Sequence, residues 1–517
     1  MRVSLHPLDY AVLAAYVLIV LVVCARTVRR APDADELFLA GRSLGAGVVG
    51  LSLFASNISS TTLIGLPGAA WEHGISVANY EWMAALVLIF SLWFVVPVFI
   101  GRRLTTVPEL LEQRFDRGMR RYLSGVTVFL ALVLDTAGSL YAGALVLTLF
   151  FPGLALAPTC AAIALFAGLY TAAGGLRAVA YTDVVQSIVL LLGSALLFVL
   201  VWGQFDYSWE AVRTAVAPEK LSLIRPADDP SLPWTGTLLG LPILGFYYWT
   251  MNQYVSQRLL GARDLTAAAR GSLLAAALKL LPVFLMVLPG VMAIPLLGGL
   301  ERADLVFPTL IARYAPVGIA GLILAGLLAA IMSSIDSALN SASTLITVDF
   351  VRPRRPGMDT QAMARLGRML TMGLVALAAL WAPMIDRFQG LFAYLQQTFA
   401  YVTPPLVAVF VLALFSRRIG AVAALRATLT GHAVSLVAFV AAQCGWMPLH
   451  FTVVAGVLFA MTVGAAYLWQ FAAGADRPDA AQLGSVDRRS VPRLSPGQRV
   501  LALALVAVTA AIVIALR

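Results

Sequence analysis

Long, continuous apolar runs dominate this sequence and set the first limit on its fold. The chain has 517 residues, of which 60% are hydrophobic and only 12% charged, and its mean hydropathy is +0.88. A soluble domain of this size does not have that composition. Because the runs are continuous instead of alternating, they do not suit a β-barrel either. The sequence therefore predicts an all-α polytopic membrane protein embedded in a lipid bilayer.

The apolar runs are long enough to cross the hydrocarbon core about fourteen times, since a helix needs roughly 20 residues to do so. The polar connections between them are too short to hold another folded domain, so residues 1–517 are expected to form a single transmembrane domain. The expected spans are 8–26, 44–66, 79–101, 121–150, 155–172, 180–203, 236–257, 270–298, 316–346, 366–386, 390–416, 421–443, 450–471 and 499–516.

Basic residues are concentrated in every second loop between these spans. Cytoplasmic loops carry an excess of Lys and Arg, so these loops are predicted to lie inside. Both termini then lie outside a cell membrane, most simply a bacterial inner membrane. The net charge of +10 is explained by this topology and does not indicate nucleic-acid binding. The arginines concerned are Arg26, Arg29, Arg30, Arg42, Arg102, Arg103, Arg114, Arg117, Arg120, Arg121, Arg352, Arg354, Arg355, Arg417 and Arg418.

The segment Leu53–Gly68 combines polar side chains with helix-breaking residues inside an apolar run. Asn57 and five hydroxyl side chains fill its middle, and Gly65 and Pro67 follow. A helix in lipid breaks only where protein or water receives the freed backbone groups. In discontinuous transporter helices the free carbonyl groups coordinate sodium. The alternative is an unbroken helix that packs against its neighbours through small hydroxyl residues.

The ninth expected span presents hydroxyl and carboxylate oxygens on one face. Ser333, Ser334 and Ser337 follow helical spacing, and Asp336 lies among them. Such oxygens are the hard ligands that an alkali cation prefers, and an intramembrane carboxylate indicates function. Serines that bond to their own helix would explain the hydroxyls but not Asp336. Another carboxylate, Asp183, opens the sixth span, where it could instead favour the helix start through the macrodipole.

Other polar positions are spread over separate spans. Lys279 lies about nine residues inside the eighth span, roughly 13 Å along the helix, so it needs an acceptor within the bundle. Glu81 lies near the end of the third span, where contact with solvent would also explain it. Tyr248 and Trp249 follow helix breakers in the seventh span, and an aromatic belt at the membrane surface is the alternative. Gln396 lies early in the eleventh span.

Several short blocks in a fixed order resemble one known family, the sodium:solute symporters, and within it the sodium/glucose cotransporters. Any one block alone would be weak, whereas their order along most of the chain, from about residue 36 to 418, is specific. The blocks are Gly41-Arg42-Ser43, Phe54–Ile58, Tyr80–Trp82, Gly174–Asp183, Tyr248-Trp249, Gln257-Arg258, Lys279-Leu280, Met332–Ser343 and Leu391–Pro405.

The resemblance implies a LeuT-like core of two inverted five-helix repeats, with sodium and solute at the midplane between them. The two repeats are expected at about 44–203 and 236–416. The helices expected at the periphery are 8–26, 421–443, 450–471 and 499–516.

The resemblance also implies where the ions would bind. A site for Na+ is expected from the carbonyl groups of Ala55, Ile58 and Ala330 and from the hydroxyl groups of Ser333 and Ser334. Some relatives use a second sodium nearby. Its positions in this chain would be Asp183, Ser334, Asp336 and Ser337, although the sugar transporters usually have a hydroxyl residue where this chain has Asp336.

For the solute, the resemblance implies polar contacts from Asn57, Glu81, Lys279 and Gln396, with Tyr248 and Trp249 as an inner stacking gate. Thr62 stands where the mammalian proteins have His, and Gly245 replaces a polar residue. Sialic acid relatives hold the substrate carboxylate with an Arg in the fourth span. This chain has none there, so an anionic solute is disfavoured; the polar residues of that span are Asp135, Thr136 and Ser139.

These expectations together predict a secondary active symporter that imports a neutral, glucose- or galactose-like sugar with sodium by alternating access. The alternative within transporters is another small solute, such as inositol or another polyol, sialic acid, an amino acid or a monocarboxylate. A transporter-like sensor would usually carry a signalling domain, and nothing resembles a channel filter. An enzyme is not expected, because no nucleophile–base pair or nucleotide-binding loop is found in the sequence.

Overall fold

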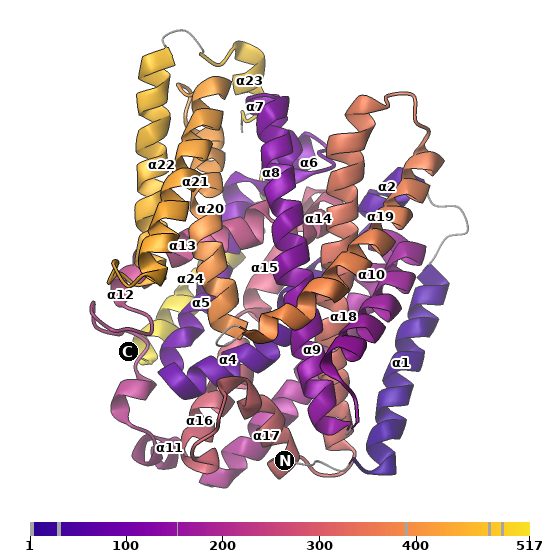
Figure 1. Ribbon diagram of the computed structural model, residues 1–517, viewed down its shortest axis with the longest axis vertical. Helices are drawn as coiled ribbons and strands as arrows, with labels where there is room; N and C mark the ends of the chain where they lie inside the picture. Colours follow the sequence, from indigo (N-terminus) through magenta and orange to yellow (C-terminus); the bar gives the residue numbers. More distant parts are fainter. Residues whose placement is uncertain are drawn as a thin grey trace.

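The structure is a computed structural model that describes residues 5–27, 33–151, 153–387, 391–473, 477–487 and 491–516. Apart from two isolated β-bridges, Leu44–Ala262 and Arg225–Pro233, these residues form helices, turns and connecting loops. The long helices run side by side as one bundle, with α1 (Pro7–Thr27) on one flank and α22 (Phe451–Ala473) on the other (Figure 1).

The other helices follow in chain order. The first half contains α2 (Ala34–Leu39), α3 (Ala46–Asn57), α4 (Ser60–His73), α5 (Asn79–Phe94), α6 (Val96–Gly101), α7 (Val107–Arg114), α8 (Arg117–Leu130), α9 (Ala137–Phe150), α10 (Leu156–Trp202) and α11 (Trp209–Ala215). The second half contains α12 (Trp234–Leu239), α13 (Leu241–Phe246), α14 (Gln253–Leu260), α15 (Leu265–Leu278), α16 (Leu288–Leu297), α17 (Val306–Tyr314), α18 (Ile319–Leu345), α19 (Thr360–Trp381), α20 (Leu391–Phe415), α21 (Ala421–Gln443), α23 (Ala480–Gly484) and α24 (Pro496–Ala515).

Within the described residues, 11 helices are long and apolar enough to cross a membrane, and the bent pair α3–α4 raises the number to 12. The expected count of fourteen is therefore not confirmed. Two differences explain the lower number. The expected spans 155–172 and 180–203 join in α10, and the expected span 236–257 is divided into pieces too short to count separately.

A single glycine marks the junction of the two spans that join in α10. Gly175 has φ 58° and ψ −160°, a conformation that is essentially restricted to glycine. A straight helix of that length would extend about 70 Å, more than twice the hydrocarbon thickness, so the chain must turn here. A Cβ at this position would lie 2.5 Å from the carbonyl oxygen of Leu37, because α2 packs directly against the turn.

Burial separates a central helix from the helices around it. In the most apolar stretch of the span that contains α18, 83% of the residues are buried. The corresponding stretches of α1 and α24 are only 28% and 17% buried. The apolar side chains of α1, α21, α22 and α24 thus face outward, as lipid contact requires. α18 packs against α10, α3, α4 and α9, so its polar face is directed into the protein.

The arginine-rich connections gather at one end of the bundle, where α2, α6, α7 and α23 lie (Figure 1). Arg42 donates to the carbonyl oxygen of Arg103 at 2.8 Å, and Arg120 pairs with Asp349 at 2.6 Å. Arg114 donates to the carbonyl oxygen of Ser416 at 2.8 Å. α11, α16 and α17 lie at the opposite end. This segregation matches the predicted loop pattern, and the assignment of the arginine-rich end to the cytoplasm stays a prediction.

Replacing Gly175 by alanine should destabilise the protein, because the new Cβ meets the Leu37 carbonyl group and the backbone conformation is closed to alanine. Strain and overpacking together predict a loss of about 2–5 kcal/mol, visible as a lower melting temperature of the purified protein in detergent. Gly373→Ala is the matched control, since no atom lies within 4 Å of its Cβ position. Equal melting temperatures for the two variants would contradict this account of the turn.

Candidate functional site

The helix pair α3–α4 is broken in the middle of the bundle. α3 ends at Asn57, and Ile58 leaves the helical region with φ −80° and ψ 82°. The Ser59 hydroxyl then accepts from the backbone N–H of Thr62 at 3.3 Å and caps α4. Ser, Thr and Asn compete with the helix for backbone groups in this way and favour caps. The two helices meet at 54°, so the broken helix is present and not the unbroken helix that the sequence left open as the alternative.

The break leaves carbonyl oxygens at the end of α3 without helical donors. The N–H groups of Ile58 and Ser59 donate to the carbonyl oxygens of Phe54 and Asn57 at 3.1 and 2.9 Å. Among the described residues, no donor is recorded for the carbonyl oxygens of Ala55 and Ile58. These are two of the oxygens that the resemblance assigned to sodium, and α18, which carries the other three, packs against both α3 and α4.

The α18 positions are arranged less uniformly than their spacing indicated. Ser334 donates to the carbonyl oxygen of Ala330 at 2.9 Å and lines a cavity beside the break. Ser333 instead donates to Asp183 at 2.5 Å. Hydroxyl and carbonyl oxygens from Ala55, Ile58, Ala330 and Ser334 would suit an alkali cation by their chemistry. Ser333 is engaged with the neighbouring carboxylate.

That carboxylate belongs to a buried polar cluster at the residues expected to hold a second sodium. Asp183 accepts from Ser52 at 2.5 Å, in addition to Ser333. Asp336 accepts from Tyr170 at 2.5 Å and from Ser337 at 3.2 Å. All of these side chains are buried. The structure therefore brings Asp183, Asp336 and Ser337 together, while the Ser334 hydroxyl is directed to its own helix.

Arg258 completes this cluster, and sequence reasoning gave it no role. Its fully buried guanidinium donates to Asp183 at 3.2 Å and to Ser52 at 3.1 Å, and it also contacts Ser337. Of the two carboxylates, Arg258 contacts Asp183 directly, and it is linked to Asp336 through Ser337. The signal was available, because a charged residue deep in the bundle needs a partner, and that argument was applied only to Lys279.

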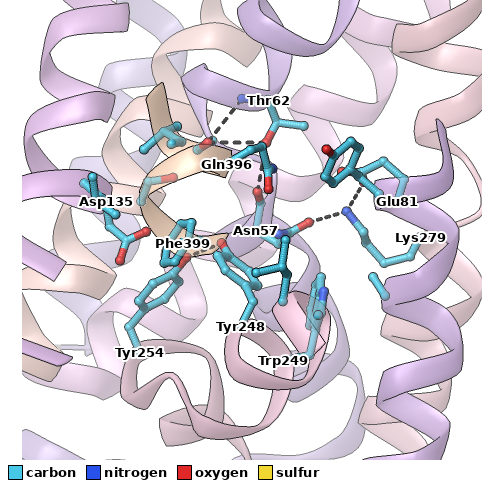
Figure 2. A pocket seen from close by; sticks show the side chains of 18 of the residues that line it. Asn57, Thr62, Glu81, Asp135, Tyr248, Trp249, Tyr254, Lys279, Gln396 and Phe399 are labelled. Atoms are coloured by element: carbon cyan, nitrogen blue, oxygen red, sulfur yellow. Dashed lines mark hydrogen bonds and ion pairs between the residues drawn. The ribbon is translucent and has the colours of Figure 1, made fainter. Parts of the chain in front are cut away.

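The cavity beside the break has a volume of about 120 Å³, whereas one water needs about 10–15 Å³ by the same measure. It therefore has room for several waters or a small solute. All seven residues expected to contact the solute line it, and Figure 2 shows them around one space. They are Asn57, Thr62, Glu81, Tyr248, Trp249, Lys279 and Gln396.

Lys279 has the hydrogen-bond acceptors that its position deep in the helix bundle requires. Its ammonium group forms an ion pair with Glu81 and donates to the side-chain oxygen of Asn57 (Figure 2). The ammonium nitrogen also lies 5.4 Å from the centre of the Trp249 ring. Lys279 follows the last residue of α15, Glu81 lies in the first turn of α5, and Asn57 ends α3. One ion pair thus ties three separate helices to the cavity.

Aromatic side chains form another part of the cavity wall. Tyr248 lies in the π-helical turn η6 (Tyr247–Met251), which ends at the break before α14. Its ring packs edge-on against Trp249, Tyr254 and Phe399, with centroid distances of 5.5, 5.8 and 6.2 Å. The hydroxyl groups of Tyr248 and Tyr254 are hydrogen-bonded to each other. An aromatic face in a polar cavity suits the C–H face of a ring-shaped solute.

Other lining residues were not expected to contact a solute. Tyr254 and Phe399 belong to the aromatic wall, and Asp135 and Ser139 come from the region of η3 (Ala131–Thr136) and α9. Gly245, where a polar residue was expected, also lines the cavity. Asp135 stood out only as a polar residue in an apolar span, which does not reveal the side of the helix that faces a cavity.

The comparisons with known proteins identify the family. The model of the sodium:solute symporter family matches residues 37–431. The chain belongs to this family. The sodium/glucose cotransporter 2 of Rattus norvegicus is 34% identical over 460 residues, which cover 80% of this chain and 68% of the relative. The sodium/myo-inositol cotransporter 2 of Mus musculus is 36% identical over 456 residues, covering 80% of this chain and 67% of the relative. The relatives are transporters, as expected, and not enzymes.

Solved structures show the same fold. A Na+-coupled sialic acid symporter in a substrate-bound outward-open state superimposes with a TM-score of 0.79 at 24% identity, covering 90% of this chain and 98% of that one. Mhp1, a nucleobase-cation-symport-1 family transporter, gives a TM-score of 0.58 at 16% identity, with coverages of 91% and 98%. The predicted LeuT-like, all-α fold is therefore confirmed.

The pairing of Lys279 with Glu81 predicts a non-additive effect on stability. Lys279→Met leaves a buried carboxylate without its partner, which should cost about 3–5 kcal/mol and lower the melting temperature in detergent. The double variant Lys279→Met/Glu81→Met removes both charges and should recover much of that loss. If the double variant melts at the temperature given by adding the two single effects, the two side chains are not a coupled pair.

Proposed function

We propose that this protein is a sodium-coupled symporter that imports a neutral, polyhydroxylated solute, with a hexose such as glucose or galactose as the first candidate. The observation that carries the proposal is the Lys279–Glu81–Asn57 contact on the wall of a cavity next to the helix break. In this proposal the cavity holds the solute, the break holds sodium, and alternating access moves both across the cell membrane.

The chemistry of the cavity favours a solute rich in hydroxyl groups. Lys279, Asn57 and Gln396 supply donors, Glu81 and the amide oxygens supply acceptors, and Tyr248 supplies an apolar face. Lys279 and Glu81 compensate each other, and the described lining residues include no arginine. A substrate carboxylate would therefore lack an uncompensated cation, which argues against sialic acid, amino acids and monocarboxylates.

Sodium and solute would be linked through a single residue of the break. Asn57 lies between the proposed sodium ligands Ala55 and Ile58, and its side chain meets Lys279 in the cavity. A cation bound at the carbonyl groups of the break and at Ser334 would fix this backbone and thereby position the Asn57 amide for the solute. Membership of the sodium:solute symporter family supports Na+ as the ion.

A second cation remains part of the proposal. Asp183 and Asp336 are two acidic groups, whereas Arg258 is the one basic side chain that contacts this cluster among the described residues. With both acids ionised, one negative charge would have no basic partner. The cluster with Ser337 therefore retains capacity for one monovalent cation, and uncompensated charge inside a membrane bundle commonly marks an ion path. The expected orientation, with both termini outside and the arginine-rich end in the cytoplasm, belongs to the same proposal.

Inositol is the second candidate solute. The sodium/myo-inositol cotransporter 2 is 36% identical to this chain, and a cyclic polyol presents the same alternation of hydroxyl groups and C–H faces as a hexose. Binding of glucose, galactose, myo-inositol, sialic acid and proline to the purified protein in sodium would separate the classes. The proposal requires a hexose or polyol to bind, and exclusive binding of sialic acid or proline would refute it.

The two proposed sites predict that two substitutions weaken the binding of different ligands. Ser334→Ala should weaken the apparent affinity for sodium about tenfold, which corresponds to about 1.4 kcal/mol for one lost ligand. Glu81→Gln should weaken solute affinity by about 10- to 100-fold, or roughly 1.5–3 kcal/mol for a lost bond to a charged group. The Glu81→Gln variant should bind sodium with an affinity near that of the wild type. Sodium binding can be followed by tryptophan fluorescence, and solute binding by calorimetry in saturating sodium.

Ser341→Ala is the matched control for the sodium site. Ser341 also lies on α18 and bonds to a carbonyl oxygen of its own helix, that of Ala338 at 3.0 Å, but it is not among the cavity residues. It should leave both affinities unchanged. A sodium affinity that falls equally in Ser334→Ala and Ser341→Ala would show that the effect arises from helix packing and not from a lost ligand.

A further inference from the structure

Asp135 is the one charged residue of the cavity that the proposed function leaves without a role. It lies in the π-helical turn η3 and lines the cavity together with its neighbour Leu134. Figure 2 shows it on the far side of Asn57 and Tyr248 from Lys279. A π-helical turn inside a longer helix often marks a functional position, and the turn η6 that carries Tyr248 is of the same kind.

The Asp135 carboxylate has fewer hydrogen-bond donors around it than it has positions to accept hydrogen bonds. An ionised carboxylate offers about four acceptor positions. Asn252 lies within hydrogen-bonding reach, and its amide is oriented for this because its oxygen accepts from the N–H of Tyr254 at 3.3 Å. Tyr254 is also within hydrogen-bonding reach, and its hydroxyl group is hydrogen-bonded to that of Tyr248 as well. The second carboxylate oxygen, Oδ2, is buried and has no hydrogen-bond partner.

The charges of the cavity leave Asp135 uncompensated as well. The charged lining residues in the described part of the chain are Glu81, Lys279 and Asp135. Glu81 and Lys279 form an ion pair with each other, so no basic side chain among these lining residues is left to pair with Asp135. A buried polar group without a partner is costly, and a buried charge more so. A donor that enters with the solute would remove this cost.

We propose that Asp135 determines solute specificity by accepting a hydrogen bond from the end of the solute remote from Lys279. The inference rests on the proposed function and adds a solute class to it. A hydroxyl group can satisfy Asp135, and a protonated amine at the same position satisfies it better, because it also compensates the charge. A carboxylate at that position is repelled. The cavity therefore accepts neutral sugars and protonated amino sugars, and it rejects uronic acids.

The test compares solutes that differ at one position. Glucose, its deoxy analogues at C2, C3 and C6, its amino analogues at the same positions and glucuronic acid are bound to wild-type protein in sodium, at a pH where the amines are protonated. At one position the amino analogue should bind at least tenfold tighter than the deoxy analogue, and glucuronic acid should bind at least tenfold weaker than glucose. In Asp135→Asn the amino advantage should disappear.

Asp228→Asn is the matched control, because Asp228 is an exposed loop residue and should leave every ratio unchanged. An amino advantage that survives in Asp135→Asn, or that is lost equally in Asp228→Asn, overturns the role of Asp135. If Asp135→Asn does not fold, the wild-type order still decides, and equal binding of deoxy and amino analogues at all positions refutes the inference. Failure of glucose, galactose and myo-inositol to bind the wild type would instead refute the proposed function, and this inference with it.

Discussion

The structure depends on the break between α3 and α4, because lipid cannot form hydrogen bonds with the backbone groups that the break frees. After Asn57 the chain leaves the helix, and no donor to the carbonyl groups of Ala55 and Ile58 is recorded among the described residues. Such a break is tolerated only inside a bundle that can receive these groups. The surrounding helices meet this condition, because α18 packs against both halves with a polar face, and a cavity lies beside the break. Polar side chains thus gather beside the break, because its freed backbone groups need polar surroundings.

Buried charges then determine which helices must stay together. Lys279 joins α15 to α5 and α3 through Glu81 and Asn57, and Arg258 joins α14 to α10, α3 and α18 through Asp183, Ser52 and Ser337. Breaking either set would leave an unpaired charge away from water, at a cost of several kcal/mol. A transport cycle must therefore move these helices as groups or replace the lost partner with a ligand. Sodium and a hydroxyl-rich solute are ligands of the kind that could do so.

The sequence predicted the parts of this arrangement that follow from depth in the membrane. Lys279 had to find an acceptor, and Asn57 combined an amide with a helix break. That the two meet at one solute site was implied only by the resemblance to the symporter family. Features that depend on rotation about a helix axis were not predictable. Spacing placed Ser333 and Ser334 on one face, but only the structure shows that Ser333 bonds to Asp183 while Ser334 lines the cavity. The span count differs for other reasons, because α10 continues through the turn at Gly175 and counts as one span, while the expected span 236–257 is divided into short pieces.

The central claim, that a sodium gradient drives a neutral, hydroxyl-rich solute through this protein, is tested most directly in proteoliposomes. Labelled glucose and myo-inositol would be offered outside vesicles that contain the purified protein, with an inward gradient of sodium, of potassium or of protons. The account predicts transient accumulation above the external concentration of at least one of these solutes, with the sodium gradient only. Uptake that is equal without sodium, or that follows the proton gradient alone, would contradict it.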